Sequence, residues 1–166
     1  MKLLSCLALL ALSAAATAST PPPFEPYAPA AGTVTPGRCH MDGCGWVKWL
    51  SVTSARDDAT GEITVIAQVD NGVSEDEESV KGKPVVAWDN QPQKVTVLCS
   101  YSRPTVTFTT SNQGTQVHEL ILAPGEMVVG YMESSSLMYF QACHSDTVRS
   151  IEDGIAQHHY GVVNHR

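Results

Sequence analysis

The sequence of 166 residues has no long apolar run beyond its N-terminal segment. A membrane-spanning helix needs about 20 apolar residues, so we expect no membrane span. The apolar run over residues 3–12 is too short for one and follows the positive charge of Lys2. Small residues then lead to Ala16-Thr17-Ala18, which is typical of a cleavage site. This pattern predicts a signal peptide over residues 1–18 and an exported protein, either periplasmic or secreted.

Basic residues are scarce: 10 lysines and arginines stand against 17 aspartates and glutamates, a formal net charge of −7. A negative surface repels nucleic-acid phosphates, and no stripe of basic residues offsets it, so we expect no nucleic-acid partner. An acidic protein attracts cationic partners instead, at a rate that falls with salt. The charge therefore either keeps the protein in solution or favours a basic, secreted or cell-wall-associated protein partner.

Sequence motifs of several enzyme classes are missing. No serine has the flanking glycines of a nucleophile elbow, and no glycine-rich phosphate loop follows a strand pattern. His118-Glu119 begins like a zinc-protease motif, but Leu122 stands where the second histidine is needed. We assign no catalytic residue and expect no cofactor. A carboxylate-dependent hydrolase using, for example, Glu119, Glu126 or Glu133 is a third alternative function.

Cysteines are few, and their number becomes even when Cys6 leaves with the predicted signal peptide. Disulfides persist in oxidising compartments, so we expect two of them. The turn signal between Cys39 and Cys44 favours one bridge, and positions near strand ends favour a second between Cys99 and Cys143. Sequence alone leaves the two crossed pairings open.

Three regions follow from proline content and hydrophobic periodicity. Residues 19–37 contain repeated prolines, which disfavour helix, and we expect a disordered lead-in there. Residues 38–166 suit one domain, with alternating strand patterns and then a helical period over about 145–160, where Ser145 is the expected N-cap. The predicted fold is mainly β: a single antiparallel β-barrel or sandwich of about seven or eight strands with a C-terminal α-helix, stabilised by disulfides.

The individual strands are predicted from alternation and from β-branched or aromatic content. Segments 44–53 and 62–69 are expected to form one hairpin, and 117–122 and 127–132 a second one around Pro124-Gly125. Ser74 and Glu77 match a capping box, which predicts a short helix. The remaining strands are expected at 85–88, 95–101, 105–110 and 137–143.

Two features are candidates for protein recognition. One is the densest run of charge in the chain, which is either a solvated loop or a recognition element for a basic surface and consists of Glu75, Asp76, Glu77 and Glu78. The other is a tryptophan pair, because Trp46 and Trp49 would occupy opposite faces of a strand. We expect one of the two to be exposed and take Trp49 as the candidate aromatic anchor.

Metal handling is the alternative function. Donors suited to copper or zinc occur at His40, Met41, His144, His158 and His159. Zinc would also accept thiolates from the cysteines if these were not bridged. The features taken together predict an exported, non-enzymatic binding module, of inhibitor or immunity type, acting on a basic protein partner.

Overall fold

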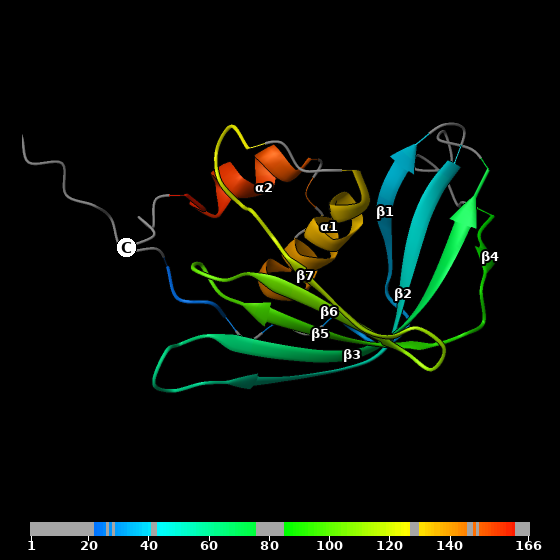
Figure 1. The fold of residues 1–166 in the computed structure, drawn as a ribbon, viewed down its shortest axis with the longest axis horizontal. Coiled ribbons are helices and arrows are strands. Elements are labelled where there is room, and N and C mark those ends of the chain that lie inside the picture. The colour runs from blue at the N-terminus through cyan, green and yellow to red at the C-terminus, as the bar shows by residue number, and fades with distance from the viewer. Residues whose placement is uncertain are drawn as a thin grey trace, which may run out of the picture.

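A computed structural model describes residues 22–25, 27, 29–40, 43–75, 85–126, 130–145, 148 and 150–161. Within these residues seven antiparallel strands form one sheet, with the order β1-β2-β3-β5-β6-β7 and with β4 paired to β3 beside this path (Figure 1). The strands are β1 (Val34–His40), β2 (Gly43–Arg56), β3 (Ile63–Ser74), β4 (Ala87–Trp88), β5 (Gln93–Cys99), β6 (Thr105–Thr110) and β7 (Gly114–Glu119). The helices are α1 (Gly130–His144) and α2 (Ile151–Gln157).

The sheet is open, because β1 and β7 stand at the two ends of the path of paired strands. The predicted mainly β, antiparallel fold is therefore confirmed. Of the two predicted architectures, the open sheet excludes a closed barrel and agrees with a sandwich. Helix α1 packs across one side of the sheet, and α2 lies against α1 (Figure 1). Neither described helix is long and apolar enough to cross a membrane.

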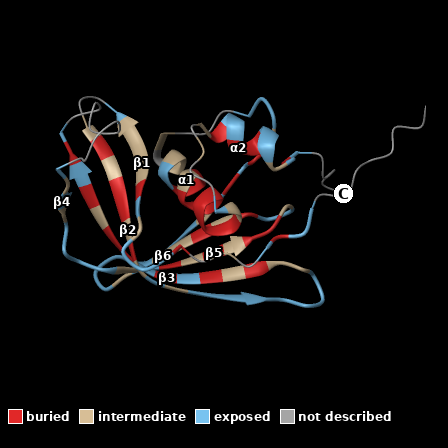
Figure 2. Ribbon diagram, turned by 180° about the vertical axis from the view of Figure 1, so that it is seen from behind, coloured by how far each residue is buried: buried red, intermediate tan, exposed pale blue. Residues whose placement is uncertain are grey.

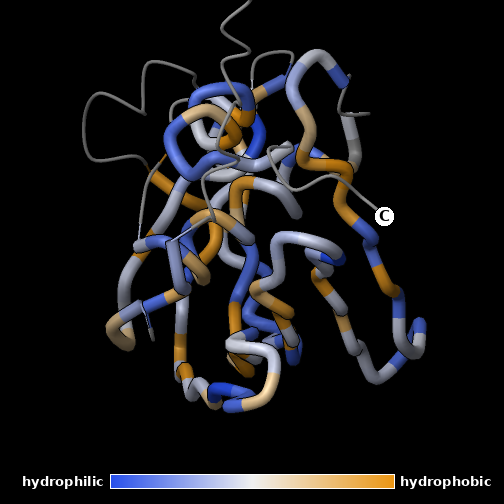
Figure 3. The backbone as a smooth tube through the Cα atoms, turned by 90° about the vertical axis from the view of Figure 1, so that its left-hand side faces the viewer, coloured by the Kyte–Doolittle hydropathy of each residue, from blue (hydrophilic) through white to orange (hydrophobic). Residues whose placement is uncertain are grey.

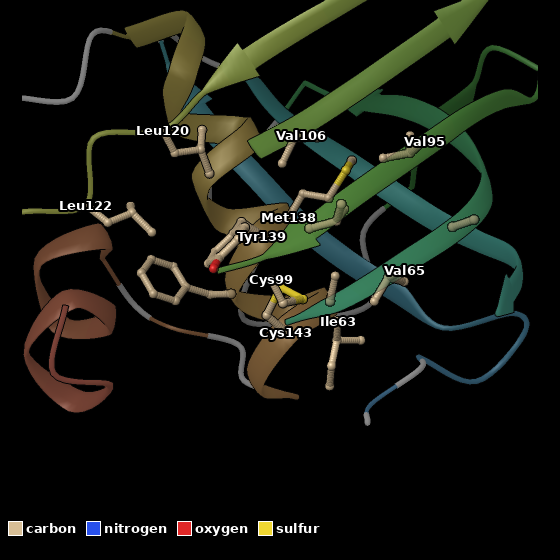
Figure 4. Close-up of a cluster of buried hydrophobic side chains, with 14 of the residues drawn as sticks. Ile63, Val65, Val95, Cys99, Val106, Leu120, Leu122, Met138, Tyr139 and Cys143 are labelled. Carbon is tan, nitrogen blue, oxygen red and sulfur yellow. A yellow bond between two sulfur atoms is a disulfide. The ribbon is translucent and has the colours of Figure 1, made fainter. Parts of the chain in front are cut away.

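Alternation along the strands builds the core. Every second residue of β3 from Ile63 to Val69, and of β5 from Val95 to Cys99, is buried, while the residues between them are more exposed (Figure 2). Hydrophobic and hydrophilic positions alternate along the tube in the same way (Figure 3). The buried face of the sheet meets side chains of α1 (Figure 4). The core residues labelled there from the strands and α1 include Ile63, Val65, Val95, Cys99, Val106, Met138, Tyr139 and Cys143.

Both favoured disulfides are formed. Cys39 and Cys44 are opposite each other in the β1–β2 pair, with their Cα atoms 4.0 Å apart. Cys99 at the end of β5 is bonded to Cys143 near the end of α1, with 5.5 Å between their Cα atoms (Figure 4). The first bridge closes a local hairpin, whereas the second ties the helix to the sheet.

Helix α1 corrects the prediction of a strand over 137–143 and of a second hairpin arm over 127–132. Strand β7 ends at Glu119, residues 127–129 lie outside the described part, and residues 130–132 already belong to α1. Apolar residues at 137, 139 and 143 do alternate, but Met138, Phe140 and Ala142 between them are buried too. A helix buried on most sides has no single apolar stripe, so its period is not visible in the sequence.

Helix α2 lies within the predicted C-terminal helix but is shorter than that range. Its N-cap is Ser150, whose side chain accepts a hydrogen bond from the Asp153 N–H. Ser145, the predicted cap, has a φ of 61° and cannot begin a helix in that conformation. The helical period predicted there agrees with the burial of Ile151 and Ile155, which lie about one turn apart.

One expectation about the segments outside the strands changes, and another falls outside the described residues. Residues 34–37, expected to be part of the disordered lead-in, belong to β1, and Phe24 is buried with only 5% of its surface exposed. The Arg56 guanidinium donates to the Phe24 carbonyl, which fixes this early segment against β2. Ser74 ends β3 as a buried residue, and the capping-box helix predicted after it lies outside the described residues, beyond Glu75.

Candidate binding site

A hollow of about 530 Å³ opens where the connection from β5 to β6 passes the chain that leaves β7. We call this hollow the groove. The Leu120 N–H donates to the Pro104 carbonyl at 2.9 Å and holds the two segments side by side. The groove is lined by Leu98, Tyr101, Ser102, Arg103, Pro104, Thr105, Glu119, Leu120, Ile121, Leu122 and Ala123.

The groove has apolar walls. Leu120 and Leu122 belong to the buried core, whereas Ile121 between them is 68% exposed. Tyr101 is half-buried, and its ring stacks on Phe24 with 4.5 Å between the ring centroids. Burial raises the pKa of the Tyr101 hydroxyl, so this side chain stays neutral. The walls therefore suit an aliphatic chain that enters from solvent.

Arg103, which lines the groove, forms an ion pair with Glu62, so the two charges neutralise each other. Arg103 donates to both carboxylate oxygens of Glu62, at 3.3 Å from Nε and 2.8 Å from Nη2. The hydrogen bond from Arg103 lowers the pKa of Glu62, so the carboxylate stays charged and neutralises the guanidinium. Glu119 is the other charged residue of the lining and is exposed. The groove consequently carries the negative charge of Glu119.

A second hollow of about 340 Å³ lies on the other side of the Tyr101–Ser102 segment, which lines both. Phe24 forms one wall, together with the prolines before it, and the turn before β3 forms another. This wall contains Glu62, the partner of Arg103. The β5–β6 connection is thus accessible from two sides, with one ion pair joining it to β3.

A buried cluster of tyrosines and histidines lies behind this connection. The Tyr139 hydroxyl donates to the Ser100 carbonyl at 3.0 Å and accepts from the Ser100 N–H at 3.1 Å. It also lies 2.7 Å from the Tyr160 hydroxyl, which is 2.9 Å from Nε2 of His144. These contacts join the segment after β5, helix α1 and the segment after α2. Burial raises the pKa values of Tyr139 and Tyr160, so both hydroxyls stay protonated.

His144 is held neutral in this cluster. Its ring stacks on that of His158, with 3.7 Å between centroids and 16° between planes, and packs against Phe24. Desolvation first, and then the neighbouring His158, lower the pKa of His144 to about 3. A neutral imidazole that contacts a tyrosine hydroxyl is a structural element here, since it takes up a proton only in strong acid.

His118 and Ser135 form a pair that sequence analysis did not predict. Nδ1 of His118 on β7 lies 2.7 Å from the hydroxyl of Ser135 on α1. A serine beside an imidazole is the arrangement of an activated nucleophile. Ser135, however, is only 1% exposed, so a substrate cannot reach its hydroxyl. The pair joins α1 to the sheet.

The predicted recognition features are not brought together. Trp49 is fully buried, with its Nε1 donating to the Thr35 hydroxyl at 3.2 Å, so it is not an exposed anchor. Trp46 is also buried, and its Nε1 donates to the Ser74 hydroxyl at 2.9 Å. In the acidic run, Glu75 is exposed and the other three residues lie outside the described part. The tryptophan interpretation is therefore wrong, because both faces of β2 are covered at this end.

The predicted metal donors are mostly apart. The four cysteines are bridged and offer no thiolate, His40 and His159 are exposed, and Met41 is outside the described residues. Among the predicted donors that the structure describes, only His144 and His158 come together, with their rings face to face. The described residues contain no group of three His, Cys, Asp or Glu side chains placed to hold a metal ion. Of the carboxylates named for a hydrolase, Glu133 is paired with Arg38 at 2.9 Å.

Sequence reasoning missed the groove, although it had noted Glu119. The lining comes from two segments that are separated by a hairpin, and nothing in their composition marks them as neighbours. A signal was present in Leu120-Ile121-Leu122, because three consecutive apolar residues on a strand cannot all point to the same face. The sequence matches no protein-family model, and comparisons with curated proteins and with solved structures found no match.

Proposed function

We propose that the protein is an exported, non-enzymatic binding module, of inhibitor or immunity type, whose groove receives a lysine or arginine of a basic protein partner. The proposal rests on two features of the groove. Its walls are largely apolar, and it contains the carboxylate of Glu119, for which the described residues show no ion pair. Export is supported by the signal-like N-terminal segment and by the two disulfides, which persist in oxidising compartments.

Lysine and arginine have the two properties that this groove selects. Their aliphatic stems pack on apolar surface while the charged head stays at the rim. Here the stem would lie against Leu98 and Ile121, and the head would meet Glu119. The ring of Tyr101 also lines the groove and offers an aromatic face to a cation. The net charge of −7 adds a long-range attraction that accelerates encounter with a basic protein.

The chemistry of the neighbouring residues agrees with binding rather than catalysis. All four cysteines in the described part of the chain are in disulfides, so none of these four provides a thiolate nucleophile. The hydroxyl of Ser135 that contacts His118 is closed off from solvent. Arg103 is occupied by Glu62 and supplies no free cation for an anionic substrate.

The test uses residues 19–166, the chain without its predicted signal peptide, which we call the mature protein. Its retention on immobilised basic hydrolases, lysozyme among them, is measured at low and at high salt. We expect retention at low salt that salt weakens, because rim charges act through screened electrostatics. Glu119→Gln should weaken binding about tenfold, since one charge-assisted hydrogen bond is lost. Glu152→Gln, an equally exposed carboxylate on α2, is the matched control and should change binding little. No retention on any of these proteins, or equal loss in both variants, would remove the proposal.

A further inference from the structure

Strand β7 ends the sheet and has a neighbour on one side only within the described residues. Five of its six residues are exposed and the sixth is half-exposed, with Val117 at 58%. A free strand edge presents unpaired N–H and C=O groups to any other strand. Prolines, bulges and charged side chains, above all lysine, block such edges; β7 has no proline, lysine or bulge, and its acidic residue Glu119 stands at its C-terminal end.

The opposite edge shows what a blocked edge looks like in this chain. Strand β1 contains Pro36, and its register with β2 shifts between Pro36 and Cys39. Arg38 lies in the same stretch and is bound to Glu133 of α1. A proline and a register shift, which both discourage pairing with another strand, therefore occur on β1, and neither occurs on β7. Of the two edges, β7 is therefore the one that can accept a further strand.

The direction of the backbone groups on β7 follows from one hydrogen bond. The Leu120 N–H points to β6, where it donates to the Pro104 carbonyl. In an antiparallel pair these groups alternate along the strand, toward the partner and away from it. The N–H and C=O groups of Thr115, Val117 and Glu119 consequently point away from β6, toward the open side.

We propose that β7 pairs with β7 of a second copy, antiparallel and centred on Val117. In this arrangement the two-fold axis passes between the two copies of Val117, perpendicular to the sheet. The corresponding faces of the two sheets then lie on the same side of the combined sheet. Centring on Val117 places the outward N–H and C=O groups of both strands opposite each other. Val117 then faces its own copy, and Thr115 faces Glu119 of that copy. In this register no like charges stand opposite each other, and the Val117 side chain, which is 58% exposed, packs against the same side chain of the second copy.

The contact is short, so the dimer should be reversible and its fraction should rise with protein concentration. Two copies with a formal charge of −7 each repel one another, and salt screens that repulsion. Salt should therefore strengthen the dimer, whereas it should weaken the capture of a basic partner by the groove. The opposite salt dependences keep this inference separate from the proposed function, and either can fail alone.

Sedimentation velocity of the mature protein tests the pairing. We expect twice the monomer mass at high concentration and high salt. Val117→Lys and Val117→Glu should each be monomeric because like charges then face each other, and mixing them should restore a dimer. Val73→Lys is the matched control, since Val73 on β3 is 59% exposed and lies away from β7; it should stay dimeric.

Oxidative cross-linking tests the register without relying on those charged variants. Val117→Cys should form a disulfide-linked dimer, because facing residues of an antiparallel pair lie within bridging distance. Thr115→Cys should not, since two copies of residue 115 would be four strand positions apart. A monomer under all conditions, a Val73→Lys variant that also loses the dimer, or equal cross-linking of both cysteine variants would overturn the proposal.

Discussion

The Tyr139 hydroxyl is the polar group on which the contact between α1 and the β5–β6 connection depends most. It bonds both the N–H and the carbonyl of Ser100, a residue that is 1% exposed. Buried backbone groups without partners are costly, and water has no access here to replace the hydroxyl. A side chain that serves as the partner of two buried backbone groups therefore affects stability more than its size suggests.

Tyr139→Phe should destabilise the protein by about 1 to 3 kcal/mol, because two backbone groups of Ser100 lose their partner. Urea unfolding of the mature protein measures the effect. Tyr101→Phe is the control, because within the described residues no hydrogen bond of its hydroxyl is seen, and it should cost clearly less. Equal losses in the two variants would show that the Ser100 contacts contribute nothing specific.

The neutral His144 makes stability depend on pH. Its pKa is about 3 in the folded protein and about 6.5 in an unfolded chain, so the unfolded state binds more protons below pH 6.5. The stability is complete above pH 6.5 and is lost progressively as pH falls toward 3. Since His144 is partly exposed, we expect a loss of about 1 to 2 kcal/mol between pH 7 and pH 5. His144→Gln should flatten this decrease in urea unfolding; an unchanged slope would contradict the assignment.

At the scale of elements, the sequence predicts best the segments that are buried on one face. Strand β5, and β3 as far as Val69, alternate between buried and more exposed residues, so their inward residues could be predicted from the sequence. Helix α1 could not, because Met138, Phe140 and Ala142 are buried together with the alternating residues around them. The groove depends on where β6 and β7 place two distant segments, which is a property of register and not of local composition.

The two disulfides should differ in what they contribute. On the chain-entropy model a bridge that spans a sequence separation of 44 contributes about 4 kcal/mol, and one that spans 5 contributes about 2. Replacing Cys99 and Cys143 together by alanine should therefore lower the free energy of unfolding about twice as much as replacing Cys39 and Cys44 together. Urea unfolding of the two double variants decides this, and a larger loss from the Cys39–Cys44 pair would contradict it.

At the scale of the whole molecule, charge and shape act at different ranges. The net charge of −7 attracts any cationic protein from a distance and does not choose the contact point. The groove determines the contact point, because there the Glu119 carboxylate lies beside apolar walls while the nearby Arg103 is neutralised by Glu62. The exposed carboxylate of Glu75, which follows β3, lines neither of the two hollows described above.

The most direct measurement is therefore an NMR titration of the mature protein with an oligolysine peptide, following the backbone amide of each residue. We predict shifts centred on Ser102 and on Glu119 to Ile121, which are reduced by salt and by Glu119→Gln. Shifts centred on Glu75 instead, or spread evenly over all exposed carboxylates, would show that charge alone binds the peptide and would contradict the groove as the binding site.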